Sequence, residues 1–387
     1  MTTPRKRILI AIDWYLPGFR GGGPITSIAN LVDALGDEYD FLIVTSDTDQ
    51  GESKPYLEIP TDRWVESGPH CSVWYCSAEG RGYRHFRKLL GETEYDLLSL
   101  NSMFSLRFSI FPLWSSRAAK PEVPVLLAPR GMLHAGALSL KPLKKKIFLR
   151  IIRLMGIDKH LIFQATDAQE VLDIKGIFGE DTKVLQASNL PRMHQPPFQS
   201  LEKQSGSLRM VFLSRLTEKK GLHFLLELLQ TQTADIHLDI IGPDTEQGYW
   251  QRCLALIAQL PKNVTVNKQD GLPPQAAFEK LVTAHCFVMP TLGENFGHAI
   301  FESFLAGRPV LISDQTPWQG LENQLIGFDI QLEDHAGFRA AIDRLAAMDQ
   351  VEWELWAKSS WRFAEAYLDR GNLAKESECM LNAALES

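Results

Sequence analysis

Two glutamates, Glu294 and Glu302, stand eight residues apart in the stretch PTLGENFGHAIFESFLAGRPVLIS. This stretch has the pattern of a strand end, a glycine-containing loop, a helix, a loop and a second strand. The helix is predicted to begin after Gly297 and to end at Gly307, which accepts the left-handed conformation that commonly terminates helices. A helix that starts at the carboxyl end of a parallel strand directs backbone N–H groups at anions. One carboxylate would then lie beside phosphates and the other beside a diol such as ribose, which suits a nucleotide-linked sugar.

Two cations follow an earlier predicted strand. Arg215 lies at the end of MVFLSRL, and Lys220 precedes Gly221 at the start of the next helix. The planar guanidinium offers a fork of donors, and the ammonium is a compact point charge. Together they can neutralise a diphosphate that departs during a reaction, although two solvated loop charges are the alternative. Lys219 is the weaker candidate and is expected to be a surface lysine.

Consecutive glycines follow the first predicted strand, in the sequence Gly21-Gly22-Gly23-Pro24. The spacing does not fit the dinucleotide fingerprint G-x-G-x-x-G. Glycines still allow a ligand to approach the backbone closely, and Pro24 suits a first helical turn. Gly22 and Gly23 are therefore candidate ligand contacts, with a flexible loop as the alternative.

Other polar residues in the N-terminal half are weaker candidates. Asp47-Thr48-Asp49 has the D-x-D spacing that binds metals in some enzymes, but we interpret it as a loop motif and expect no metal site. His134 and Arg130 follow the strand VPVLLAP. Arg130 is a candidate contact for a phosphate or for a second substrate. His134 is a candidate on the same side, and the sequence does not decide between them.

Length and composition favour a two-domain globular protein. The chain has 387 residues, more than one hydrophobic core usually supports. Its formal net charge of −7 argues against a nucleic-acid-binding protein. The five cysteines have no zinc-site spacing and suit a reducing compartment. The N-terminus does not resemble a signal peptide, so we expect a cytoplasmic protein.

The order of predicted elements gives an α/β fold. Strands alternate with helices on both sides of the segment 191–209, which is rich in Pro, Gln and Ser and is predicted to be a linker. We therefore expect Rossmann-like, doubly wound domains at 1–190 and 210–365 that face a central cleft. The remaining segment, 366–387, is expected to be a helix that returns to the first domain.

A basic run extends from Lys141 to Arg153 and contains no acidic residue. As a helix, it would place Leu143, Ile147, Ile151 and Leu154 in one stripe. One interpretation is a helix that contacts anionic lipid headgroups, so that the protein lies peripherally on the inner face of the cytoplasmic membrane. The alternative is an ordinary amphipathic helix with a solvated basic side.

The combination of P-T, E-x7-E with an internal N-F-G, F-L-A-G-x-P-V and R-L-x-x-x-K-G resembles the retaining glycosyltransferases of the group 1 family (glycosyltransferase family 4). The resemblance suggests the bacterial polysaccharide or cell-envelope type. It implies a GT-B fold and transfer from a nucleotide-diphosphate sugar to a saccharide or polyprenyl-linked saccharide. No metal or other cofactor would be needed, and no nucleic acid would bind.

The resemblance also implies roles for individual residues. Glu294 would orient the sugar hydroxyls, Arg215 and Lys220 would stabilise the leaving diphosphate, and Glu302 would hold the ribose. The expected catalytic residues are Glu294, Arg215, Lys220 and His134, and the expected donor-binding residues are Gly22, Gly23, Arg215, Lys220, Leu272, Asn295, Phe296, Gly297 and Glu302. A sugar-nucleotide epimerase and a catalytically silent binding protein remain as alternatives, and the donor sugar and acceptor are not specified.

Overall fold

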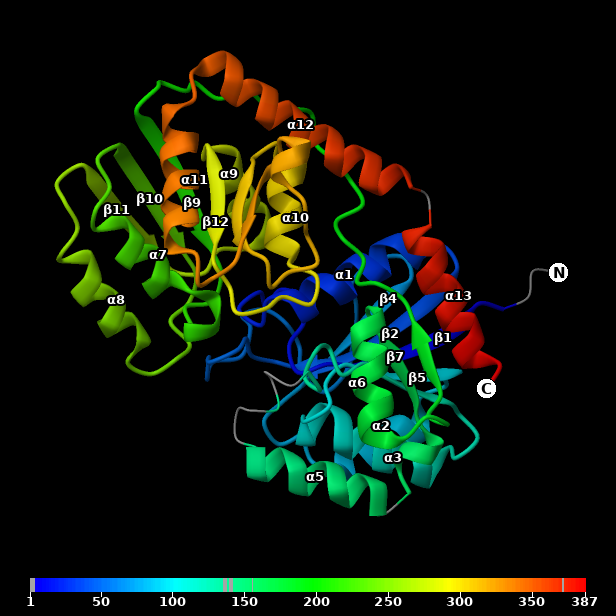
Figure 1. Cartoon of the computed structure of the whole chain (residues 1–387). Coiled ribbons are helices and arrows are strands. Elements are labelled where there is room, and N and C mark those ends of the chain that lie inside the picture. Colours follow the sequence, from blue (N-terminus) through cyan, green and yellow to red (C-terminus); the bar gives the residue numbers. More distant parts are fainter. Residues whose placement is uncertain (1–3, 135–137, 139–141, 155, 371) are drawn as a thin grey trace. The chain divides into compact units, whose positions relative to one another are not determined.

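The computed structural model describes residues 4–134, 138, 142–154, 156–370 and 372–387. The chain divides into two compact units (Figure 1). The N-terminal unit comprises Met1–Leu190 and Gly371–Ser387, and the C-terminal unit comprises Pro191–Arg370.

The N-terminal unit is built on an eight-stranded sheet in the order β3-β4-β2-β1-β5-β6-β7-β8. Every pairing is parallel except that of β3 with β4. The strands are β1 (Lys6–Ala11), β2 (Tyr39–Ser46), β3 (Trp64–Glu66), β4 (Cys71–Cys76), β5 (Leu97–Leu100), β6 (Val125–Leu127), β7 (Ile162–Ala165) and β8 (Val184–Gln186). The helices are α1 (Gly23–Leu35), α2 (Tyr83–Glu92), α3 (Phe111–Ala119), α5 (Pro142–Leu154), α6 (Ala168–Phe178) and α13 (Leu373–Leu385).

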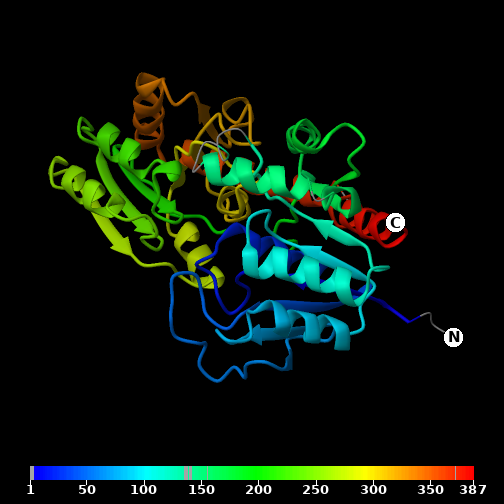
Figure 2. The ribbon, with the colours of Figure 1, turned by 90° about the horizontal axis from the view of Figure 1, so that it is seen from below.

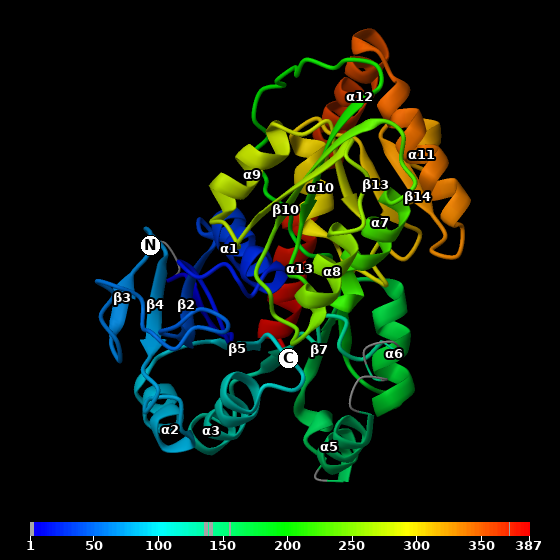
Figure 3. The ribbon, with the colours of Figure 1, turned by 90° about the vertical axis from the view of Figure 1, so that its left-hand side faces the viewer.

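Helices cover both faces of this sheet. The short apolar runs of its central strands are fully buried, as expected for a parallel sheet between two helical layers. One core contains side chains of α1 and α13, and the other contains side chains of α2, α3, α5 and α6 (Figure 3). The C-terminal helix α13 is tied to the sheet by Tyr39, whose hydroxyl donates to Asn382 Oδ1 at 2.8 Å.

The C-terminal unit has a six-stranded parallel sheet in the order β11-β10-β9-β12-β13-β14. The helices α7, α8 and α11 lie on one face, and α9, α10 and α12 lie on the other (Figures 1 and 3). Its strands are β9 (Ser207–Leu213), β10 (Asp235–Ile241), β11 (Val264–Gln269), β12 (Cys286–Met289), β13 (Val310–Ser313) and β14 (Gly327–Ile330). Its helices are α7 (Leu222–Leu229), α8 (Tyr249–Ile257), α9 (Pro274–Val282), α10 (His298–Leu305), α11 (His335–Ala347) and α12 (Gln350–Asp369). The order of strands in the sheet changes direction after β11, because β12 pairs with β9 on the side opposite β10. The carboxyl ends of β9 and β12 therefore lie side by side, and ligands usually bind at such a point in a parallel sheet.

The segment predicted to be a linker packs on the C-terminal unit instead. Strand β9 begins at Ser207, and side chains of the C-terminal unit donate to carbonyl groups of the preceding segment. Arg308 Nη2 donates to the Gln199 carbonyl at 2.9 Å, and Trp361 Nε1 donates to that of Pro196 at 2.9 Å. These hydrogen bonds satisfy carbonyl groups of a segment that belongs to no strand or helix. The Pro- and Gln-rich segment is therefore packed on the C-terminal unit and is not a loose linker.

Candidate active site

A close backbone contact brings two strand ends together in the C-terminal unit. Gly221 begins α7 in the left-handed conformation, with φ of 76°. A Cβ at this position would lie 2.0 Å from the carbonyl oxygen of Pro290, which follows β12. The glycine therefore lets the turn at Lys220 reach the loop that carries Glu294.

Lys220 and Glu294 form an ion pair at this junction. The distance from Lys220 Nζ to Glu294 Oε1 is 2.5 Å, and the side chains are 15% and 13% exposed. Thr291 Oγ1 donates to the same carboxylate oxygen at 3.1 Å. Glu294 Oε2 accepts no hydrogen bond from the part of the chain that the structure describes. The pair is thus held in place while one carboxylate oxygen stays available to a ligand.

Two further cations, Arg215 and Lys219, interact electrostatically with Glu294. Burial lowers the pKa of Arg215, and the charge of Glu294 opposes that shift. Burial also lowers the pKa of Lys219, Glu294 opposes the shift, and the like charges of Lys220 and Arg215 add to it. Three cations around one carboxylate leave an excess of positive charge, which favours a diphosphate.

Lys219 is exposed, as the sequence predicted, and its backbone joins the two loops. Its carbonyl accepts a hydrogen bond from Leu292 N at 2.8 Å and also lies 3.1 Å from Thr291 Oγ1. Its side chain also passes Gly293, where an added Cβ would lie 4.0 Å from Lys219 Cε. Thr291 is absent from the set predicted from the sequence, in which Lys219 is the weaker candidate.

Helix α10 begins beside this cluster, at the predicted place. Gly297 precedes it in the left-handed conformation, with φ of 80°, and a Cβ there would lie 2.8 Å from Ile300 Cδ1. The preceding Phe296 is buried, and its carbonyl accepts a hydrogen bond from Trp318 Nε1 at 2.6 Å. Asn295 stands between Phe296 and Glu294 in the same loop. This packing fixes the direction in which the helix N-terminus points.

Glu302 lies one turn inside α10 and is mostly buried. Burial raises the pKa of its carboxyl group to about 7, and the charge of Arg192 opposes that shift. Within the described residues, its carboxylate accepts no hydrogen bond. A mostly buried carboxylate without such bonds is costly unless a ligand supplies donors. Leu272, another expected contact, is half-buried in the loop between β11 and α9, at the same edge of the sheet.

The predicted glycine contacts lie in the other unit. Gly22 precedes α1 with φ of 70°, and Gly23 is the first residue of that helix. Asp49 holds the loop before them, because its carboxylate accepts from Phe19 N at 2.9 Å and from Arg20 N at 3.2 Å. Asp47, the other acid of the D-x-D motif, forms an ion pair with Arg81. Both acids therefore stabilise loops in the N-terminal unit.

Arg130 is engaged within the N-terminal unit. It adopts a positive φ of 56°, and its guanidinium donates to Asn101 Oδ1 at 2.6 Å and to Asn189. Burial lowers its pKa to about 10, and Glu170 opposes the shift. Glu170 itself accepts from Gly131 N at 2.6 Å. Arg130 thus connects three segments of one domain, which does not fit a contact with a second substrate.

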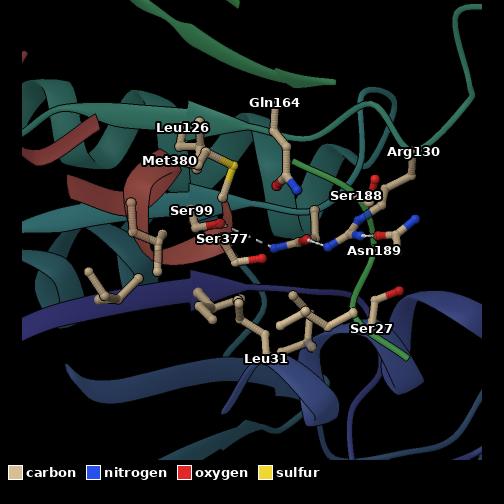
Figure 4. A pocket seen from close by; sticks show the side chains of 16 residues that line it. Ser27, Leu31, Ser99, Leu126, Arg130, Gln164, Ser188, Asn189, Ser377 and Met380 are labelled. Carbon is tan, nitrogen blue, oxygen red and sulfur yellow. Dashed lines mark hydrogen bonds between the residues drawn. The ribbon is translucent and has the colours of Figure 1, made fainter. Parts of the chain in front are cut away.

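A small cavity lies beside Arg130 (Figure 4). Its volume is about 20 Å³, and Ser99, Gln164, Ser188 and Ser377 contribute polar lining. The Nε atom of Arg130 is buried and has no hydrogen-bond partner in the described structure. A cavity of this volume holds a single water molecule, so it is too small for a sugar.

His134 has a different environment. Its Nδ1 atom pairs with a carboxylate oxygen of Asp173 on α6, and the imidazole remains 30% exposed. Gln169 Nε2 donates to the other oxygen of Asp173 at 3.1 Å. The imidazole is therefore oriented by a carboxylate and still reaches solvent, which leaves it able to meet a substrate.

Comparison with known proteins finds a family model that matches the segment carrying this site. Residues 195–350 match the family model described as glycosyl transferases group 1. The matched residues cover most of the C-terminal unit, which therefore resembles the group 1 glycosyltransferases. No curated protein sequence matches the chain.

Solved structures extend the likeness to the whole chain. Sucrose-phosphate synthase from Thermosynechococcus elongatus has a TM-score of 0.68 at 15% identity, covering 98% of this chain and 99% of that one. Anabaena HepE in complex with UDP and glucose has a TM-score of 0.67 at 14% identity, covering 98% and 100%. WaaG, a glycosyltransferase involved in lipopolysaccharide biosynthesis, has a TM-score of 0.64 at 14% identity, covering 97% and 98%. The predicted GT-B fold is confirmed.

Proposed function

We propose that the protein transfers a sugar from a nucleotide-diphosphate donor to a saccharide or polyprenyl-linked saccharide, with retention of anomeric configuration and without a metal. The observation that carries the proposal is the ion pair of Lys220 and Glu294 in the electrostatic field of Arg215 and Lys219, at the carboxyl edge of a parallel sheet that matches the group 1 glycosyltransferase model. A site with excess positive charge beside a helix N-terminus suits a diphosphate.

In this proposal Arg215 and Lys220 stabilise the negative charge that grows on the diphosphate as the sugar departs. Glu294 positions Lys220 through Oε1 and offers Oε2 to a sugar hydroxyl. Glu302 accepts hydrogen bonds from the ribose, which would supply the donors that its carboxylate lacks. Gly22 and Gly23 approach the donor phosphates through their backbone.

The acceptor side is proposed to use His134. Asp173 engages Nδ1 of the imidazole, so Nε2 is the nitrogen that remains for an acceptor hydroxyl. A polyprenyl-linked acceptor would accord with a peripheral position on the inner face of the cytoplasmic membrane. Across the described residues, no helix is long and apolar enough to cross a membrane.

The experiment is a donor panel that begins with UDP-glucose, because HepE has been solved with UDP and glucose. Purified protein is incubated with each nucleotide sugar, with and without saccharide acceptors. Release of nucleoside diphosphate, with a product whose anomeric configuration matches the donor by NMR, supports the proposal. An altered sugar formed from donor alone would instead indicate an epimerase. Tight donor binding without release for any acceptor would indicate a silent binding protein.

A further inference from the structure

Helix α5 presents its apolar side to solvent. Leu143, Ile147, Ile151 and Leu154 are 72%, 51%, 49% and 80% exposed. Their spacing of four, four and three residues places them in one line along the helix, called here the outer stripe. Leu149 and Ile152 face the domain core instead and are 7% and 3% exposed. The apolar stripe predicted from the sequence exists, but it is not the face that the domain buries.

The position of α5 leaves the outer stripe open. The helix lies at the lower edge of its unit in Figures 1 and 3, and Figure 2 is seen from that side. A surface helix ordinarily turns its polar face outward. Four large exposed apolar side chains in one line therefore indicate a surface that is covered in some functional state.

Cations flank the outer stripe on both sides. With 3.6 residues per turn, Lys144 falls on one flank, and Lys146, Arg150 and Arg153 fall on the other. All four are exposed, and α5 contains no acidic residue. Lys145 lies on the packed side, with Nζ 5.2 Å from the ring centroid of Phe104. Lys141, which belongs to the same predicted basic run, lies outside the described residues.

We propose that α5 docks the protein on an anionic lipid bilayer, with the outer stripe inserted at the boundary between headgroups and acyl chains. An apolar face bordered by cations fits this interface, because the cations reach lipid phosphates while the stripe leaves water. The formal charge of the whole chain is −7, so the local positive charge specifies which face meets the membrane. Each cation contributes about a five-fold factor in partitioning at low salt.

This inference deepens the proposed peripheral location, and its test needs neither donor nor turnover, so the two proposals can fail independently. The full-length protein is sedimented with vesicles of phosphatidylcholine alone and of phosphatidylcholine with phosphatidylglycerol, at low and high salt. We expect sedimentation with the anionic vesicles at low salt and release at high salt. Failure to sediment with anionic vesicles at low salt would overturn the proposal.

Two variants separate the apolar and the electrostatic contributions. Changing all four residues of the outer stripe to serine should lower the partition coefficient at least ten-fold. Lys144→Glu, Lys146→Glu and Arg150→Glu together should lower it at least a hundred-fold. The matched control is Arg84→Glu, Arg87→Glu and Lys88→Glu on α2, which makes the same charge change at three exposed cations. Equal loss in the control would show that only total charge matters, and unchanged binding in either α5 variant would refute docking by insertion.

Insertion depth provides a further readout. With Ile147→Trp, the added indole should shift its fluorescence to shorter wavelength on anionic vesicles and be quenched by brominated acyl chains. An unshifted spectrum would exclude insertion of the outer stripe. Concentration-dependent dimers that the serine variant abolishes, without vesicle binding, would identify a second copy of the chain as the occupant and overturn the proposal.

Discussion

The two units use charged residues at the ends of their parallel strands in opposite ways. In the C-terminal unit, Glu294 pairs with Lys220 and interacts electrostatically with Arg215 and Lys219, and Glu302 lacks a hydrogen bond from the described residues. In the N-terminal unit, Asn101 and Asn189 accept from the guanidinium of Arg130, and Glu170 accepts from backbone N–H groups. The first arrangement is incomplete without a ligand, whereas the second stabilises the domain.

A buried arginine can either stabilise a domain or bind a ligand. Burial lowers the pKa of Arg130 and of Arg215 alike, so the shift alone does not distinguish a structural arginine from one that binds a ligand. The partners distinguish them. Neutral amides accept from Arg130, while Arg215 interacts electrostatically with Glu294, a carboxylate already paired with Lys220.

The largest expected effect would come from the cluster around Glu294. Lys220→Ala or Arg215→Ala should lower turnover about 10²- to 10³-fold, the usual effect of removing one group that stabilises charge in the transition state. Turnover at saturating UDP-glucose and the dissociation constant of the same donor are measured for each variant. A loss confined to donor affinity would contradict the assigned role and weaken the contrast between the units.

Replacing Arg130 should affect stability and not donor binding. Arg130→Met removes a donor from both Asn101 and Asn189, and we expect the N-terminal unit to lose about 3 kcal/mol of unfolding free energy. Denaturant unfolding followed by circular dichroism measures this loss, with the exposed Lys88→Met as control. If the variant keeps its stability but loses turnover, Arg130 belongs to the site and the comparison fails.

Replacing Glu302 should weaken donor binding and raise stability, the reverse of the effects expected for Arg130. Glu302→Gln should weaken binding of UDP-glucose by about 1–3 kcal/mol, because the ribose loses a charged acceptor. The same variant should be more stable than the wild type at pH 8. The pKa rises from 4.5 in the unfolded chain to about 7 in the folded one, so ionisation destabilises the fold as pH increases through this window. The gain is at most about 3 kcal/mol and vanishes below the unfolded value.

The affinity for the donor should depend on the ionisation of Glu302 as well. If the ribose binds the ionised form of Glu302, affinity for UDP-glucose falls by up to about ten-fold for each pH unit below 7. The diphosphate of a sugar nucleotide does not titrate in this range, which makes it a cleaner probe than UDP. Calorimetry from pH 5.5 to 8 measures the slope, and the Gln variant should flatten it. An equal slope in both proteins would remove Glu302 from the ribose site.

The smallest expected effect is that of chelation. Turnover should be unchanged by EDTA, because the proposed site neutralises the diphosphate with Arg215, Lys219 and Lys220. Complete loss that manganese or magnesium restores would overturn the metal-free mechanism. Such a result would also reopen the role of Asp47 and Asp49, which stabilise loops in the N-terminal unit.

The sequence was most informative where neighbouring residues in the chain determine the structure. The glycine-bounded loop predicted the start of α10 at Gly297, and the fold class followed from alternating strands and helices. It could not show that Arg130 would be enclosed by Asn101 and Asn189, since those partners come from distant segments. Periodicity likewise placed the outer stripe of α5 on one face but did not reveal that this face points to solvent.

The contact of Gly221 with Pro290 has a consequence for how this protein tolerates change. Even alanine at Gly221 would place a carbon atom 2.0 Å from the Pro290 oxygen, so α7 and β12 would have to separate. Lys220 would move with α7 while Glu294 stayed near β12. A saturation screen for activity should therefore score position 221 as intolerant as the charged residues, although a hydrogen atom is all that its side chain contributes.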